Sequence, residues 1–158
     1  MHVYYLEKML LITCPSGLSS LVGTECKRLG YQPRGTFPTG CRLTEESLTS
    51  IYSLNLRLRT ANKVFYELTQ GEVTSFEDLF QLVKQTDISA WMHQDTPLSI
   101  EVITQESPLH AVQSIQSVAH KAFLELQATL TTKEPTQPTQ GILILLQGNT
   151  AHILINTS

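Results

Sequence analysis

The longest amphipathic segment of the chain covers residues 107–126, where apolar side chains recur with helical spacing. The opposite face carries amides, imidazoles and one ammonium instead of a scatter of charges. Ser107 followed by Pro108 is typical of a helix cap and a first-turn proline. We therefore expect a long helix from Ser107 to Leu126. Its apolar stripe is Val112, Ile115, Ala119, Ala122, Phe123 and Leu126, and its polar face is His110, Gln113, Gln116, His120 and Lys121.

Residues 1–72 show the pattern strand–helix–strand–strand–helix–strand. An apolar run at residues 10–14 predicts a buried strand, and the helix after it has Gly30 where a C-cap glycine belongs. The remaining segments are a hairpin at 32–44, a helix capped by Thr44 and ending near Arg59, and a strand at 63–68. This order is that of the split βαβ, or ferredoxin-like, fold.

Residues 73–158 predict a second unit with the order helix–strand–helix–strand–strand. Ser75, followed by Glu77 and Asp78, is typical of a helix N-terminus with acids in the first turn. The expected buried positions of this helix and its continuation are Phe76, Leu79, Phe80, Val83, Ile88, Trp91 and Met92. The other expected segments are strands at 98–104, 142–146 and 151–155, a loop at 131–140 and a turn at 148–149. The sequence thus predicts an α+β protein of two domains, 1–72 and 73–158.

The composition is that of a soluble globular protein. The chain has 158 residues, 41% hydrophobic and 16% charged, and it contains no apolar run of membrane-spanning length. A cytoplasmic protein without a membrane segment is expected. Cys14, Cys26 and Cys41 show no C-x-x-C spacing, so we expect buried, inert thiols. No histidine pair has metal-ligand spacing, and no metal is predicted.

The charge is distributed unevenly along the chain. The net charge is −3, which argues against binding nucleic acid by bulk attraction. Residues 1–75 hold eight Lys and Arg against six Asp and Glu, whereas residues 76–158 hold three against eight. Any contact with RNA in the second half must therefore come from local geometry and hydrogen bonds.

Five segments, in order, resemble one family. They are ITCPSGLSSLVGTECKRLGY, GCRLTEESLTSIYSLNLRLRTANKVFYEL, SFEDLFQLVKQTDISAWM, SPLHAVQSIQSVAHKAF and ILILLQGNTAHILINTS. Together they are similar to the N-terminal half of THUMP-containing, S-adenosylmethionine-dependent RNA guanine-N2 methyltransferases. The resemblance implies a ferredoxin-like domain followed by an α/β THUMP domain. It also implies a module that binds structured ribosomal or transfer RNA and presents a nucleotide to a separate catalytic domain, in cis or in trans.

The sequence departs from that family at its end. The family continues with an acid and a leucine-serine-glycine step, whereas this sequence has Asn156, Thr157 and Ser158 there. This departure favours a piece of a longer protein or a split gene. The acidic second half is a further departure, because an RNA-binding surface is usually more basic.

The resemblance gives the candidate RNA-contacting residues. Those on the long helix are Lys121, His120, Gln116 and Gln113; Lys84 would flank the same surface, and Arg57, Arg59 and Lys63 occupy the family's arginine segment. A plain solvated helix face remains the alternative for the first group, and a surface lysine for Lys84. Arg59 is expected to brace the two domains through paired carboxylates. Trp91 is expected to pack in the core or at a domain interface, and a platform on which a base stacks is the alternative.

Catalytic motifs are absent from the sequence. It has neither the glycine-rich turn that approaches S-adenosylmethionine nor the Asn/Asp-Pro-Pro-aromatic loop placed at the target amine. We expect no catalytic, cofactor-binding or metal-binding residues in this chain, with S-adenosylmethionine bound by the catalytic domain. The leading hypothesis is an RNA-targeting module. The alternative is a module that docks a partner protein without touching RNA.

Overall fold

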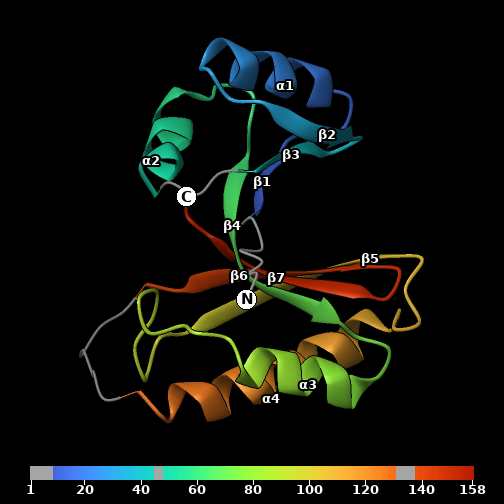
Figure 1. Cartoon of the computed structure of the whole chain (residues 1–158). Helices are drawn as coiled ribbons and strands as arrows, with labels where there is room; N and C mark the ends of the chain where they lie inside the picture. The colour runs from blue at the N-terminus through green and yellow to red at the C-terminus, as the bar shows by residue number, and fades with distance from the viewer. Residues whose placement is uncertain (1–8, 45–47, 131–137) are drawn as a thin grey trace, which may run out of the picture. The chain divides into compact units, whose positions relative to one another are not determined.

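A computed structural model describes residues 9–44, 48–130 and 138–158 (Figure 1). The chain divides into two compact units. Unit 1 comprises Met1–Glu67 and Asn156–Ser158, and unit 2 comprises Leu68–Ile155. Strand β4 (Lys63–Glu72) contributes its first half to unit 1 and its second half to unit 2. The two units are described separately.

Unit 1 is a βαββαβ unit, which confirms the ferredoxin-like prediction. Its elements are β1 (Met9–Thr13), α1 (Ser19–Arg28), β2 (Pro33–Phe37), β3 (Gly40–Thr44), α2 (Leu48–Arg57) and the start of β4. The strand order is β2-β3-β1-β4, and each neighbouring pair is antiparallel. This is the order that two interleaved βαβ crossovers produce.

The apolar run of β1 makes it an interior strand of the unit 1 sheet. Leu10, Leu11 and Ile12 are at most 1% exposed, because β1 pairs with β3 on one side and with β4 on the other. Helix α1 buries Val22 and Cys26. The helix ends as predicted: Gly30 has φ +92°, and the N–H of Tyr31 donates to the carbonyl of Cys26 at 2.9 Å.

Thr44, which is predicted to cap the second helix, is the last residue of β3 and pairs with Met9. Helix α2 is described from Leu48, so the prediction of a cap at Thr44 stays untested. Residues 45–47, which join the two elements, lie outside the described residues. The helix ends at Arg57, close to the expected end near Arg59.

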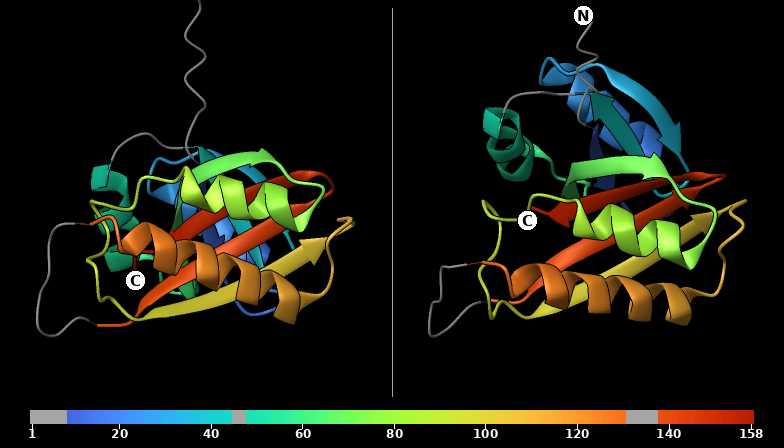
Figure 2. Two further views of the ribbon diagram at one scale, coloured as in Figure 1. Left: turned by 90° about the horizontal axis from the view of Figure 1, so that it is seen from below. Right: turned by 60° about the horizontal axis from the view of Figure 1, so that its bottom comes forward.

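Unit 2 places two helices on one face of a mixed sheet (Figure 2). Its elements are α3 (Phe76–Lys84), β5 (Leu98–Gln105), α4 (Val112–Gln127), β6 (Gln140–Gln147) and β7 (Thr150–Asn156). The strand order, with the second half of β4, is β4-β7-β6-β5. β5 and β6 are parallel and joined through α4, whereas β6 and β7 form an antiparallel hairpin. Ile142–Leu146 are all buried, as expected of a central strand.

Two helical expectations in unit 2 need correction. The long helix begins at Val112 instead of Ser107, and its N-cap, Ala111, makes no side-chain capping bond. Ser107 instead accepts a bond from the N–H of Leu109 in a local turn (3.2 Å). The residues after α3 form turns, although Ile88 and Met92 are buried as predicted. Of the expected loop at 131–140, residues 131–137 lie outside the described residues.

No helix in the described part of the chain combines the length and the apolar composition that a membrane crossing requires.

The turn into β3 provides a test of the unit 1 packing. A Cβ at Gly40 would meet the backbone oxygen of Ile12 and lie 2.7 Å from the ring of Phe37. Gly40→Ala should lower the free energy of unfolding by about 1–3 kcal/mol, the usual effect of overpacking, measured by urea denaturation. The control is Gly35→Ala, since a Cβ there meets nothing within 4 Å. Equal effects of the two substitutions would contradict this packing.

Candidate nucleic-acid interface

Helix α4 positions the predicted residues by burying its other side. Ile115, Ala119, Ala122 and Phe123 are fully buried, as the helical spacing predicts, whereas Val112, expected in the same stripe, is 40% exposed as the first residue of the helix. The outward positions then fall on two neighbouring stripes separated by about 100° around the helix axis. The first stripe holds Gln113, Gln116, Ser117 and His120; the second holds Ser114, Val118, Lys121 and Glu125.

The first stripe lies beside β5. Gln116, Ser117 and His120, with Ile100 of β5, line a shallow hollow of about 360 Å³. The side-chain amide of Gln116 donates to the carbonyl of Ile100 at 3.0 Å, so this residue is half-buried and tied to the strand. Gln113 and His120 are exposed. The hollow therefore offers neutral polar groups to a ligand.

The second stripe lies beside α3. Lys121 and Val118 line an open groove of about 380 Å³ with Phe76, Glu77 and Phe80. We call this the α3–α4 groove. Phe76 was expected to be buried, and that expectation is wrong, since its side chain is 38% exposed. Phe76 belongs to the same helical stripe as Leu79 and Val83, but as the first residue of α3 it lies at the end of that stripe.

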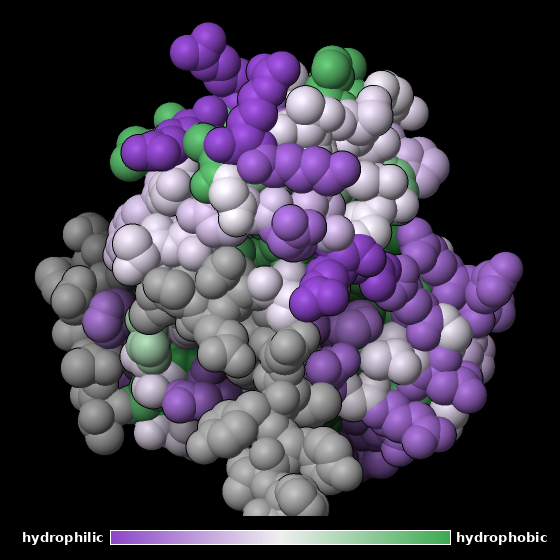
Figure 3. Space-filling view, turned by 45° about the horizontal axis from the view of Figure 1, so that its top comes forward, coloured by the Kyte–Doolittle hydropathy of each residue, from purple (hydrophilic) through white to green (hydrophobic). Residues whose placement is uncertain are grey.

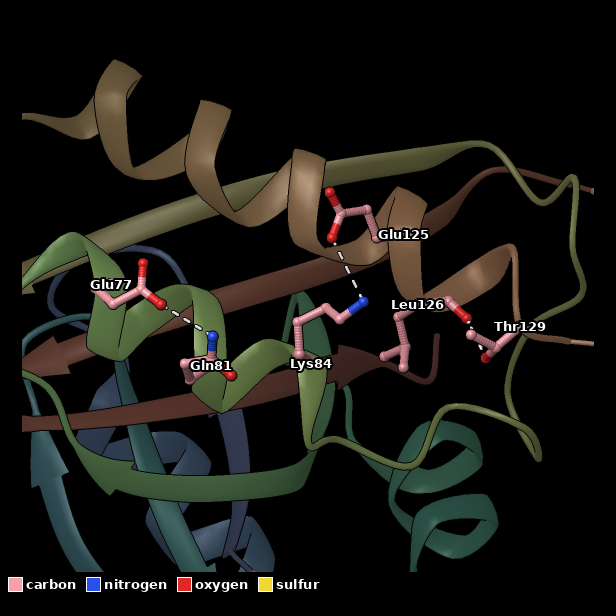
Figure 4. A network of polar contacts seen from close by, with 6 residues as sticks. All are labelled: Glu77, Gln81, Lys84, Glu125, Leu126 and Thr129. Carbon is pink, nitrogen blue, oxygen red and sulfur yellow. Dashed lines mark hydrogen bonds and ion pairs between the residues drawn. The ribbon is translucent and has the colours of Figure 1, made fainter.

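The two lysines predicted on this surface differ in their partners. Lys84 forms an ion pair with Glu125 across the two helices, with Nζ and Oε2 3.4 Å apart (Figure 4). Lys121 is exposed, and within residues 9–44, 48–130 and 138–158 no carboxylate lies within ion-pair distance of its ammonium. Lys84 thus forms an ion pair within unit 2. Lys121 has no such partner among the described residues, so its ammonium can bind a ligand.

The start of α3 is fixed by a capping arrangement that confirms the prediction for Ser75. The hydroxyl of Ser75 accepts a bond from the N–H of Asp78 at 3.1 Å. The Asp78 carboxylate in turn accepts bonds from the N–H and the hydroxyl of Thr74, each at 3.1 Å. These bonds, the backbone one above all, lower the pKa of Asp78. The capping bonds fix the first turn of α3, and with it the positions of Phe76 and Glu77, which line the groove.

The predicted basic residues of the first half, Arg57, Arg59 and Lys63, lie in unit 1. Arg57 and Arg59 are exposed, and Lys63 is half-buried at the start of β4. Glu25 of α1 accepts bonds from the backbone N–H of Arg59 at 2.9 Å and from the hydroxyl of Thr60 at 3.0 Å. A carboxylate therefore does hold the arginine segment, but within unit 1 and through the main chain of Arg59.

Exposed apolar side chains are scattered over both units. The largest are Leu21, Tyr52, Leu56, Phe76, Val112 and Leu124. The face of the molecule seen in Figure 3 is mainly hydrophilic, with hydrophobic side chains in small separate spots. Isolated exposed apolar residues are ordinary. Among these residues, Phe76 differs because it lines a groove that also contains a second aromatic ring and an ammonium.

The cysteines are buried free thiols, as predicted. A hydrogen bond to Cys26 and burial raise the pKa of the Cys41 thiol, and burial raises the pKa of Cys14. Among the described residues, no three His, Cys, Asp or Glu side chains are grouped so as to hold a metal ion.

The geometry defines a ferredoxin-like domain and an α/β unit with a helical layer on one face. Residues 9–65 match the family model of the RlmL ferredoxin-like domain. The chain is 25% identical over 116 residues to "Putative RNA methyltransferase YpsC" of Bacillus subtilis, covering 73% of this chain and 30% of that protein. These matches confirm the resemblance to RNA methyltransferases inferred from the five segments.

Two solved structures share the fold. One is described as a predicted N6-adenine-specific DNA methylase of Listeria monocytogenes; it is 23% identical, with a TM-score of 0.78, and 100% of this chain matches 43% of that one. The other is a 4-thiouridine synthetase in complex with RNA and ATP; it is 9% identical, with a TM-score of 0.58, over 96% of this chain and 41% of that one. The chain thus spans less than half the length of each of these relatives.

Sequence reasoning found the polar residues of α4 but missed the aromatic part of the surface. Phe76 and Phe80 fit the apolar stripe of α3, and only the structure shows that they line one groove with Val118 and Lys121 of α4. The signal in the sequence is weak: Phe76 directly follows the cap residue Ser75 and so lies at the end of the apolar stripe.

The ion pair of Lys84 gives a prediction for the site. Both partners are partly exposed, 31% and 47%, so the pair should stabilise the fold only slightly. A double-mutant cycle with Lys84→Ala and Glu125→Ala should give a coupling free energy below about 1 kcal/mol by urea denaturation. A coupling free energy above about 2 kcal/mol would contradict this prediction, because the ion pair would then contribute substantially to holding α3 against α4.

Proposed function

We propose that this chain is the RNA-binding, substrate-targeting module of an RNA methyltransferase, with unit 2 acting as its THUMP domain. The module would hold structured ribosomal or transfer RNA while a catalytic domain transfers the methyl group. Support comes from the RlmL-type ferredoxin-like match and from the RNA methyltransferase name of the B. subtilis relative. The resemblance of residues 107–123 to the long THUMP helix adds the assignment of unit 2.

The observation that carries this proposal is the outward side of α4. It presents an ammonium, an imidazole and an amide from Lys121, His120 and Gln113, all exposed. The ammonium of Lys121, which has no ion pair within the described residues, can bind a phosphate, and the neutral polar groups can bond to ribose hydroxyls and base edges. Since the net charge of the chain is −3, such local contacts have to supply the specificity.

RNA is preferred over DNA as the polymer. The names of the relatives disagree, because the Listeria protein is described as a DNA methylase and the B. subtilis protein as an RNA methyltransferase. The 4-thiouridine synthetase, which shares the fold, was crystallised with RNA. The hydroxyl and amide groups around His120 suit the 2′-hydroxyl, which is the group that separates RNA from DNA.

The chemistry is assigned to another domain. S-adenosylmethionine needs a glycine-rich turn between a strand and a helix, and this chain has only single glycines. Gly40 and Gly148 lie in hairpins, and only Gly17 lies between a strand and a helix. The residues present therefore do not fit the cofactor. By this proposal the chain binds and orients RNA, and the methyl donor belongs to a catalytic domain in cis or in trans.

Docking of a partner protein is the second candidate. Val112 and Leu124 of α4 are 40% and 51% exposed, and the second half of the chain is acidic. A protein dock would bind RNA negligibly at any salt concentration. An RNA module would lose affinity for RNA steeply as salt rises, because bound phosphates release counterions.

The proposal predicts that Lys121→Glu weakens RNA binding while the fold stays intact. In a filter-binding assay with unfractionated tRNA, the affinity should fall about tenfold, and the salt slope should fall by about 1, as one phosphate contact is lost. Lys27→Glu is the matched control, since Lys27 is an exposed lysine of α1 outside the candidate set. Equal affinities of Lys121→Glu and the unaltered chain would remove Lys121 from the site. Absence of tRNA binding by the unaltered chain would overturn the proposed function.

A further inference from the structure

We propose that the α3–α4 groove binds one unstacked nucleobase that carries an exocyclic amine. This inference rests on the proposed function and adds the chemistry of the RNA group that is recognised. The groove is lined by Phe76, Glu77, Phe80, Val118 and Lys121 and has a volume of about 380 Å³. Its aromatic, carboxylate and ammonium groups suit the flat face of a base, the amine on its edge and the attached phosphate.

The apolar lining suits the flat face of a base. Phe76 is 38% exposed and Phe80 is half-buried, so both rings are partly open to a ligand. Bases freed from a helix stack readily on aromatic side chains, and each such contact contributes about 1–3 kcal/mol. Val118 on the α4 side supplies further apolar surface. A stacked base would cover rings that are otherwise exposed to water.

The two charges lie on different helices. Lys121 belongs to α4, and its ammonium has no carboxylate within ion-pair distance in the described part of the chain. It is the group that would bind the phosphate attached to the base. Glu77 belongs to α3, and the side-chain amide of Gln81 donates to its Oε1 at 2.9 Å (Figure 4). This bond steadies the carboxylate and leaves Oε2 to accept from a ligand.

The carboxylate decides which bases fit. A carboxylate only accepts hydrogen bonds, so it selects bases that present an N–H donor on an exocyclic amine. Adenine, cytosine and guanine carry such an amine, whereas uracil presents a carbonyl where cytosine has its amine. A uracil stacked in the same orientation as cytosine would place that carbonyl against the carboxylate and would lack this bond. The groove should therefore favour bases with an exocyclic amine over uracil in a single-stranded segment, and adenine and cytosine serve as the test cases.

The test uses one RNA hairpin with a four-nucleotide 3′ overhang of adenine, cytosine, uracil or abasic units. Fluorescence anisotropy with the full chain should give affinities for the adenine and cytosine overhangs about tenfold above those for the uracil and abasic overhangs. Phe76→Ala should remove most of this advantage, whereas Phe76→Trp should keep it. Glu77→Gln should reduce the preference over uracil without abolishing stacking. Tyr52→Ala, which removes an exposed aromatic residue of α2, should change nothing.

The outcomes distinguish a failure of the groove assignment from a failure of the proposed RNA-binding function. Tight binding of all four overhangs alike, unchanged by Phe76→Ala, would overturn the groove assignment while leaving RNA binding intact. Loss of binding with Phe76→Ala that extends to the abasic overhang would also overturn it, because stacking cannot be the cause. Failure of the unaltered chain to bind any of the hairpins or tRNA would overturn the proposed function itself. Thermal unfolding of each variant confirms that its fold is retained.

Discussion

The burial of one side of α4 is the constraint on which the candidate site depends. Ile115, Ala119, Ala122 and Phe123 are removed from water against the sheet, which fixes the rotation of the helix about its axis. A side chain one position along the chain turns by about 100°, so the buried stripe determines which residues face β5 and which face α3. His120 and Lys121 are neighbours in sequence, yet they line different hollows for this reason.

The two lysines of helices α3 and α4 differ in their partners, and the net charge of the chain does not show this difference. Lys84 is held by Glu125, whereas Lys121 stands beside two aromatic rings without an ion pair in the described residues. An acidic domain can therefore still offer a local site for an anion. A site of this kind would recognise particular nucleotides of a folded RNA instead of coating the polymer.

Much of the fold could be predicted from the sequence, because local rules agree with the packing. The order of strands and helices in unit 1, the glycine after α1 and the Ser75 cap all follow from periodicity and backbone chemistry. The start of α4 could not, because Ser107 and Pro108 look like a cap and a first turn but form a separate turn.

The site was only half predictable. Exposed polar residues on α4 follow from helical spacing, but contacts between α3 and α4 join residues far apart in sequence. Lys84 and Glu125 are 41 positions apart, and nothing in local pattern pairs them. The groove likewise needs Phe76 and Lys121 to come together in three dimensions. The local sequence pattern does not reveal which residues of α3 and α4 face each other.

The most direct test of the account is a backbone amide NMR map of the chain, recorded while a folded RNA with a single-stranded end is added. The account predicts that amide shifts change along α3 and α4, strongest around Phe76, Gln113, His120 and Lys121. Changes confined to unit 1, or no changes at concentrations where the RNA is bound, would contradict it.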